Sequence, residues 1–154
     1  MHQNNVMRVL VFGASGMAGH VVAQYLREQD YKVDTLSGSE RFDDDTILIN
    51  VKDTEKLKTA LNSRKYDIVI NCVALLVNES EDDKTSAVQI NSLFPLFLES
   101  LYAETRTRII HISTDGIFSG KNPPYTESSI YDGQSFYGRS KALGEIDNNK
   151  DLTL

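Results

Sequence analysis

Two side chains near the C-terminus have types and a spacing that suit proton transfer. Tyr137 and Lys141 are four positions apart, so on a helix both project from one face. A tyrosine with the ordinary pKa of about 10 is a poor acid or base at neutral pH, and a nearby ammonium group favours the phenolate. Such a pair suits general acid–base catalysis at a carbonyl or carbinol. Because a lone Tyr-x3-Lys pair is common on surface helices, its meaning depends on the rest of the chain.

A third side chain with suitable chemistry follows an apolar stretch. The string Ser113-Thr114-Asp115 comes directly after the run IIHI, which is typical of a buried strand. Ligands of open α/β sheets bind beyond the carboxyl ends of the strands. The Thr114 hydroxyl is therefore placed to hydrogen-bond a substrate oxygen.

Three glycines near the N-terminus form a turn that suits a pyrophosphate. The run VLVF leads into Gly13-Ala-Ser15-Gly16-Met17-Ala-Gly19, and a helical pattern follows. Gly13 permits a tight turn, Gly16 lets backbone N–H groups approach a phosphate, and Gly19 lets the helix pack close to the sheet. The helix N-terminus adds partial positive charge and unpaired N–H groups. We therefore predict a dinucleotide site here, although glycines also mark purely structural turns.

These residues need a scaffold of alternating strands and helices. Continuous apolar runs such as VLVF, IVIN and IIHI are typical of parallel strands that are covered on both faces. We expect strands at residues 8–12, 32–36, 46–50, 67–72 and 108–113, and helices at 17–29, 54–63, 85–104 and 136–148. The closing DLTL has the pattern of a sixth strand. The alternation predicts an α/β fold: a Rossmann-type, doubly wound parallel sheet with helices on both faces.

Finer expectations concern the first helix and the loops. Ala18, Val22, Tyr25 and Leu26 recur at helical spacing and are expected to face the sheet. The charged stretches 43–45 and 78–84 are expected to be solvated loops, and the Gly- and Pro-containing stretch 118–135 a long loop.

The composition excludes several classes of protein. The chain has 154 residues, with 16 Lys and Arg against 22 Asp and Glu and a net charge of −6, which argues against a nucleic-acid binder with a basic surface. We find no apolar run long enough to span a membrane and no signal-peptide pattern. A single cysteine, Cys72, fits a reducing compartment, and we expect a cytoplasmic protein. His2, His20 and His111 lack ligand spacing, so no metal site is expected.

The order of these motifs resembles the extended short-chain dehydrogenase/reductase family. The resemblance covers essentially the whole chain and includes the glycine turn, the segment Asn71-Cys72-Val73-Ala74, the string STD and the Tyr-x3-Lys pair. It implies that Thr114 binds the substrate oxygen, that Tyr137 is the acid, and that Lys141 orients the ribose and tunes Tyr137. It also implies that Asn91 supports Lys141 through water, although Asn91 can instead serve only to cap or bridge backbone.

The family resemblance also locates the cofactor. It implies that Cys72, Val73 and Ala74 pass beneath the ribose on the nicotinamide side, and that Asn50 and Val51 flank the adenine. At the end of the second strand stands Ser37, with Arg41 close behind. A hydroxyl and a guanidinium suit a 2′-phosphate, so NADP(H) is expected over NAD(H). Asp34, an acid that would favour NAD(H), is the competing candidate.

Within the family, the stretches ISTDGIFSGKNPPYTE and YGRSKALGE are similar to the dTDP-4-dehydrorhamnose reductases, which implies reduction of a 4-keto nucleotide sugar. Gly116 departs from the tyrosine usual after STD, which puts the identity of the sugar in doubt. It also leaves no second carboxylate after Asp115, which disfavours dehydratases, and the serine-rich string of epimerases is absent. The non-catalytic beta subunit of methionine adenosyltransferase resembles the same reductases and remains an alternative.

Extended members of the family run to roughly twice this length. We therefore expect residues 1–154 to be the NAD(P)-binding Rossmann domain, with the C-terminal substrate lobe missing. The resemblance further implies a homodimer through a bundle of the helices at 85–104 and 136–148.

Overall fold

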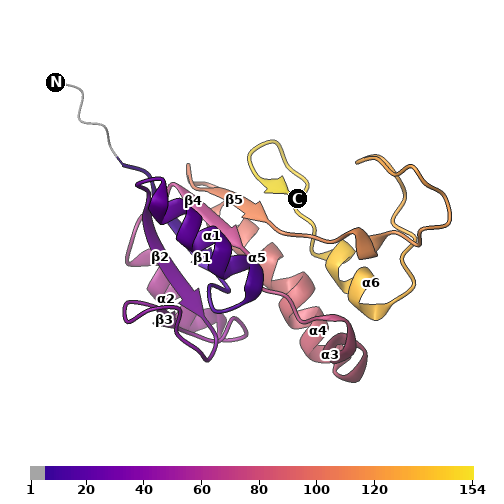
Figure 1. Ribbon diagram of the computed structural model, residues 1–154, viewed down its shortest axis with the longest axis horizontal. Helices are drawn as coiled ribbons and strands as arrows, with labels where there is room; N and C mark the ends of the chain where they lie inside the picture. Colours follow the sequence, from indigo (N-terminus) through magenta and orange to yellow (C-terminus); the bar gives the residue numbers. More distant parts are fainter. Residues whose placement is uncertain (1–5) are drawn as a thin grey trace.

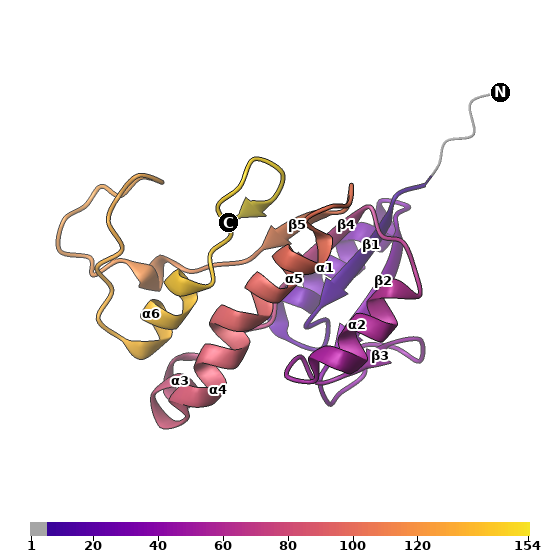
Figure 2. The ribbon, with the colours of Figure 1, turned by 180° about the vertical axis from the view of Figure 1, so that it is seen from behind.

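In a computed structural model that describes residues 6–154, one parallel sheet organises the chain (Figures 1 and 2). The described residues form six strands in the spatial order β3-β2-β1-β4-β5-β6. Their bounds are β1 (Arg8–Phe12), β2 (Lys32–Ser37), β3 (Ile47–Leu48), β4 (Ile68–Asn71), β5 (Arg108–His111) and β6 (Leu152–Thr153). The chain runs outward from β1 to β3 and then returns to β4, so the strand order reverses between β1 and β4. The predicted Rossmann-type sheet is confirmed.

The predicted strands are present, with some differences in length. β1 has the predicted bounds, whereas β3 contains only two of the five residues expected at 46–50. The strand expected at DLTL is confirmed as β6, which pairs in parallel with β5 through Ile110 and Leu152. β6 therefore forms one edge of the sheet in the described part of the chain.

Helices cover both faces of the sheet. α1 (Met17–Glu28) lies on one face, and α2 (Thr54–Asn62) and α5 (Phe94–Tyr102) lie on the other (Figures 1 and 2). Successive side chains of β1 alternate between the two faces, as the pleat requires. Val9 and Val11 pack with Ala23 of α1, whereas Leu10 and Phe12 join a larger core with residues of α2 and α5. β1 is thus buried on both sides.

The prediction of which α1 residues face the sheet was partly wrong. Val22 and Leu26 pack against the sheet, but Ala18 and Tyr25 are exposed, and the buried residues of the helix are Gly19 and Ala23. A Cβ atom on Gly19 would lie 2.2 Å from the carbonyl oxygen of Gly13. The small residues Gly19 and Ala23 therefore form the centre of the buried face, with Val22 and Leu26 packed beside them.

The prediction of a loop at residues 78–84 was also wrong. These residues are mostly exposed, but they form α3 (Val77–Asp82) and lead into α4 (Lys84–Ala87). Two contacts explain this: the buried Ser80 donates a hydrogen bond to the Leu75 carbonyl, and Asp83 accepts one from the Ser86 amide at the start of α4. Local capping and burial of one small polar residue outweigh the charge of the segment.

The two long helices expected in the second half differ in detail. The segment expected at 85–104 divides into α4, a π-helical stretch η1 (Val88–Leu93) and α5. The last helix, α6 (Phe136–Leu143), ends before the expected residue 148 because Gly144 closes it. The expected loops at 43–45 and 118–135 lack strands and regular α-helix, as predicted.

Candidate active site

The glycine turn lies at the point where the strand order reverses. Gly13 has a φ of +76°, which favours glycine, and its amide donates to the carbonyl of Leu36 at 2.8 Å. The first hydrogen bond within α1 runs from His20 to Gly16, so the amides of Met17, Ala18 and Gly19 precede it. Within residues 6–154 no side chain caps this helix, and its first turn holds no acidic residue. The turn therefore fits an anionic pyrophosphate.

The segment after β4 lies directly against this turn. A Cβ atom on Gly13 would be 3.2 Å from both the backbone carbon of Cys72 and Cγ2 of Val73, and Ala74 follows, half-buried. Burial raises the pKa of the Cys72 thiol to about 11, although the charge of Lys141 acts in the opposite direction. Cys72 is therefore a packing residue of this edge and a poor nucleophile at neutral pH.

The residues assigned to the adenosine side lie at the carboxyl ends of β2 and β3. The buried Ser37 hydroxyl accepts a hydrogen bond from the Ser15 amide at 3.2 Å, so this hydroxyl holds the glycine turn. Arg41 is exposed, and its Nη1 donates to the carbonyls of Asp44 and Thr46 at 3.0 and 2.8 Å. Asn50 is exposed, whereas the side chain of Val51 packs into the hydrophobic core.

Asp34, the competing candidate for the ribose, has other partners. Its carboxylate pairs with Arg8 at 3.0 Å and Arg64 at 3.1 Å, and accepts a hydrogen bond from the Tyr66 hydroxyl at 3.0 Å. Burial would raise the pKa of Asp34, but the hydrogen bonds from Arg8, Arg64 and Tyr66 outweigh it and lower the pKa. Because Arg8 begins β1 and Tyr66 precedes β4, this cluster lies at the amino edge of the sheet, away from the glycine turn.

Thr114 and Tyr137 meet around one glycine. Thr114 caps the short helix η2 (Asp115–Ile117), and its Oγ1 accepts a hydrogen bond from the Gly116 amide at 3.1 Å. The Thr114 hydroxyl in turn donates to Oδ1 of Asp115 at 3.5 Å, a long contact that a substrate oxygen can replace. A Cβ atom on Gly116 would lie 3.3 Å from Thr114 Oγ1 and 3.7 Å from Cδ1 of Tyr137. The structure therefore brings Thr114, in the segment after β5, close to Tyr137 of α6.

Two close backbone contacts position α6. Ser135 caps its N-terminus by accepting a hydrogen bond from the Gly138 amide at 3.0 Å. A Cβ atom on Gly138 would be 2.1 Å from the Gly116 carbonyl oxygen, and one on Gly144 would be 2.0 Å from the Asn91 carbonyl oxygen. Glycines thus let α6 lie against η2 at one end and η1 at the other.

Lys141 is buried behind Tyr137 on the same helix. Its Nζ donates to the Ile112 carbonyl at 2.6 Å and lies 3.3 Å from Nε2 of His111. Burial lowers the pKa of Lys141 to about 8. Burial, with the charge of Lys141, lowers the pKa of His111 to about 3, so the imidazole is neutral. Sequence reasoning did not assign His111 to the site, because a lone histidine in a buried strand pattern carries no spacing signal.

Asn91 makes direct hydrogen bonds to backbone and to α6, and its expected support of Lys141 through water stays a prediction. Its Oδ1 accepts a hydrogen bond from the Leu75 amide at 2.8 Å, and its Nδ2 donates to the Leu75 carbonyl and to Ser140 Oγ, each at 3.0 Å. No direct hydrogen bond to Lys141 occurs within the described residues. Asn91, at 0% exposure in η1, ties the loop after β4 to α6 and so acts on the position of this helix.

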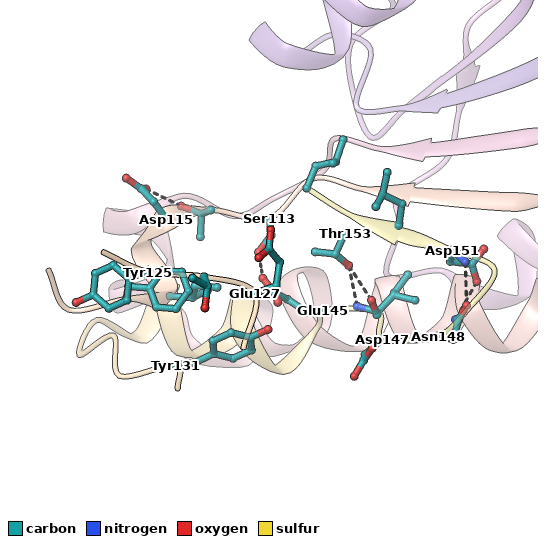
Figure 3. A pocket seen from close by; sticks show the side chains of 17 residues that line it. Ser113, Asp115, Tyr125, Glu127, Tyr131, Glu145, Asp147, Asn148, Asp151 and Thr153 are labelled. Carbon is teal, nitrogen blue, oxygen red and sulfur yellow. Dashed lines mark hydrogen bonds between the residues drawn. The ribbon is translucent and has the colours of Figure 1, made fainter. Parts of the chain in front are cut away.

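A cavity of about 760 Å³ adjoins this group at Thr114. Figure 3 shows its side chains, which come from the segment after β5 with η2, the long loop and the segment from Glu145 to the last residue. Tyr137 and Lys141 are not among the lining residues. Five carboxylates line the cavity, and none of its described lining residues is Lys, Arg or His; the five are Asp115, Glu127, Glu145, Asp147 and Asp151.

Comparison with known proteins agrees with this arrangement. Residues 7–151 match the family described as the RmlD substrate binding domain, a span that includes both the glycine turn and α6. The chain belongs to the RmlD substrate binding domain family. This membership confirms the resemblance to dTDP-4-dehydrorhamnose reductases that the motifs carry.

The curated relatives that resemble this chain have different names. The probable low-salt glycan biosynthesis reductase Agl14 of Haloferax volcanii is 34% identical over 143 residues, which cover 90% of this chain and 48% of the relative. The methionine adenosyltransferase 2 subunit beta of Rattus norvegicus is 29% identical over 148 residues, covering 92% of this chain and 43% of the relative. This chain therefore spans about half the length of the curated relatives that it matches.

A solved structure shows the same fold. The hypothetical dTDP-4-dehydrorhamnose reductase from Sulfolobus tokodaii superposes with a TM-score of 0.88 at 29% identity, covering 96% of this chain and 54% of that protein. Among residues 6–154, no helix combines the length and apolar character needed to cross a membrane. The same residues contain no group of three or more His, Cys, Asp or Glu arranged to hold a metal ion.

Proposed function

We propose that residues 1–154 are the cofactor-binding domain of an oxidoreductase that uses NADPH to reduce the 4-keto group of a nucleotide-linked deoxy sugar. The observation that carries this proposal is the meeting of Thr114 and Tyr137 around Gly116, with Lys141 one turn along α6. This group lies at the carboxyl edge of the sheet, the edge that also bears the glycine turn.

The residues present fit a dinucleotide. The turn has glycine at 13, 16 and 19 and uncapped amides at the start of α1, so Gly13, Ser15, Gly16, Met17 and Gly19 would hold the pyrophosphate. On the adenosine side, the exposed Arg41 would bind a 2′-phosphate beside Ser37, with Asn50 and Val51 near the adenine. Asp34, the acid that would favour NADH, is occupied at the opposite edge by Arg8, Arg64 and Tyr66, which favours NADPH over NADH.

The reduction assigns one task to each remaining side chain. The cofactor, when bound, supplies the hydride. Thr114 exchanges its long hydrogen bond to Asp115 for one to the sugar carbonyl oxygen, and Tyr137 transfers its own proton to that oxygen as negative charge develops. Lys141 orients the ribose, and its ammonium group provides a positive charge beside Tyr137 that favours the phenolate. Cys72, Val73 and Ala74 form the surface beneath the ribose.

The charge of the neighbouring cavity limits where the substrate lies. Five carboxylates without a cation among the lining residues would repel a diphosphate. A sugar, in contrast, presents hydroxyl donors that carboxylates accept well. The diphosphate therefore needs cations outside this cavity, and we assign only the sugar to the edge formed by Thr114, Asp115 and Tyr137.

Two measurements test the proposal. Fluorescence titration of the 154-residue protein with NADPH and NADH tests cofactor binding, and we expect tighter binding of NADPH. The reductase reaction is then followed as NADPH oxidation with a 4-keto-6-deoxy nucleotide sugar, using the longest protein that carries these residues. A protein that binds neither NADPH nor NADH would contradict the proposal.

A second candidate is a dinucleotide-binding regulatory subunit. It is favoured by the 29% identity to methionine adenosyltransferase 2 subunit beta and by the glycine at 116, where no side chain reaches toward a sugar. NADPH binding without any oxidation on keto sugars would favour it. An epimerase or dehydratase is less well supported, because Asp115 is followed by Gly116 and no second carboxylate stands in the string.

The homodimer stays a prediction. Leu93 on η1 and Leu143 on α6 are 55% and 63% exposed, and both would lie in a bundle of these helices. Sedimentation of the protein tests it.

A further inference from the structure

Three buried polar side chains form a chain behind the active site. Asn71 comes from β4, His111 from β5 and Lys141 from α6, and their exposures are 0%, 0% and 1%. Asn71 Nδ2 lies 3.0 Å from His111 Nδ1, and His111 Nε2 lies 3.3 Å from Lys141 Nζ. The ring therefore bridges the amide and the amine.

A neighbouring amide settles the direction of these contacts. The Val73 amide donates a hydrogen bond to Asn71 Oδ1 at 3.0 Å, so the NH₂ group of Asn71 is the end that faces the imidazole. An NH₂ group only donates, so Nδ1 of His111 must accept. Because the neutral ring carries one proton, that proton is on Nε2 and points toward Lys141.

We propose that Asn71 and His111 are positioning residues that control the charge of Lys141, Asn71 by selecting the imidazole tautomer and His111 by directing its Nε2–H at the lysine nitrogen. A neutral amine accepts this hydrogen and still donates to the Ile112 carbonyl. An ammonium group can only donate hydrogen bonds, so a charged Lys141 would meet the Nε2–H donor of His111 at 3.3 Å. The pair therefore favours the uncharged lysine.

Other groups around Lys141 act in both directions. Burial disfavours the ammonium, whereas the Glu145 carboxylate, just after the end of α6, favours it. Cys72, after β4, stays a neutral thiol because its pKa is about 11, and Tyr137 lies one turn earlier on α6. The balance agrees with the lowering of the pKa of Lys141 to about 8. Lys141 is then mostly charged at neutral pH and loses its charge just above it.

The consequence for catalysis rests on the proposed function. If the ammonium holds the ribose and favours ionisation of Tyr137, then NADPH affinity declines as pH rises through the pKa of Lys141. Without the Asn71–His111 pair, this decline would move to higher pH.

The test is a titration of Lys141 that needs no cofactor. The protein is labelled with ¹³C-lysine, the Cε signal of Lys141 is assigned with Lys141→Arg, and its shift is followed against pH. In His111→Gln, the rotatable amide can turn its oxygen to the ammonium, so we expect the pKa of Lys141 to rise by about one unit or more. Asn71→Ala frees the imidazole to carry its proton on Nδ1, and we expect a rise in the same direction. The control His20→Gln changes an exposed histidine and leaves the titration unchanged.

The outcomes separate the inference from the proposed function. A wild-type Lys141 that titrates with the other lysines, or one whose pKa is the same in folded His111→Gln, overturns the inference. Where a variant does not fold, the ¹⁵N shifts of His111 in the wild-type protein decide: protonated Nε2 supports the inference and protonated Nδ1 overturns it. A chain that binds no NADPH contradicts the proposed function but leaves the lysine titration as a valid test.

Discussion

The carbonyl oxygen of Gly116 lies so close to Gly138 that a Cβ atom on Gly138 would be only 2.1 Å away. This contact joins η2, which Thr114 caps, to the first turn of α6, which carries Tyr137. Thr114 and Tyr137, which would contact the substrate oxygen, are therefore held together by direct packing of the backbones that carry them.

Replacing Gly138 with alanine tests this contact. Alanine in a helix gains up to about 1 kcal/mol over glycine, but overpacking against backbone costs typically about 1–3 kcal/mol. We expect Gly138→Ala to lower the free energy of unfolding, measured by urea denaturation. Gly38→Ala is the control, since a Cβ atom there would meet nothing within 4 Å. A Gly138→Ala protein as stable as wild type would contradict the close packing.

Removing the guanidinium of Arg41 tests the cofactor assignment. A hydrogen bond to a charged group contributes about 1.5–3 kcal/mol, so Arg41→Ala should weaken NADPH binding by about ten-fold or more and leave NADH binding unchanged. Binding is measured by fluorescence titration, with the exposed Arg106→Ala before β5 as control. Tighter binding of NADH than NADPH, unchanged in Arg41→Ala, would exclude the assignment.

Tyr137→Phe keeps the ring and removes the proton. In the longest protein that carries these residues, the rate of keto-sugar reduction should decrease by about 10²–10⁴ while NADPH affinity barely changes. Lys141→Met should weaken both, because Lys141 is assigned to the ribose as well. Tyr25→Phe on the exposed side of α1 serves as control. Near-normal turnover in Tyr137→Phe would rule out the proposed acid.

Asp34 should contribute to stability in a pH-dependent way. Its pKa is lowered in the folded protein, so its contribution is present above the ordinary pKa of 3.8 and is lost as pH falls through the lower, folded value. At pH 7, Asp34→Asn should lower the free energy of unfolding by about 1–2 kcal/mol, a value reduced by the partial exposure of its partners. Asp44→Asn, in an exposed loop, is the control. If Asp34→Asn and Asp44→Asn lowered the free energy of unfolding equally at pH 7, the Asp34 cluster would add no stability beyond that of an exposed aspartate.

Periodicity and local motifs were sufficient for much of this molecule. The run VLVF predicts β1 with its observed bounds, and DLTL predicts β6, because a strand buried on both faces needs a continuous apolar run. The turn beginning at Gly13 and the Tyr137–Lys141 pair are also local, since a positive φ and a spacing of one helical turn are properties of adjacent residues.

Other features depend on contacts between distant parts of the chain. Gly19 packs on Gly13 and is buried with Ala23, whereas Tyr25 is exposed, although the spacing within α1 predicted that Tyr25 faces the sheet. The sequence contains His111 as a single residue in an apolar run, and only the pairing of β4 with β5 and the packing of α6 place it between Asn71 and Lys141. Sequence patterns report which side chains are apolar or flexible, whereas the partner of a buried polar atom is decided by which elements pack around it.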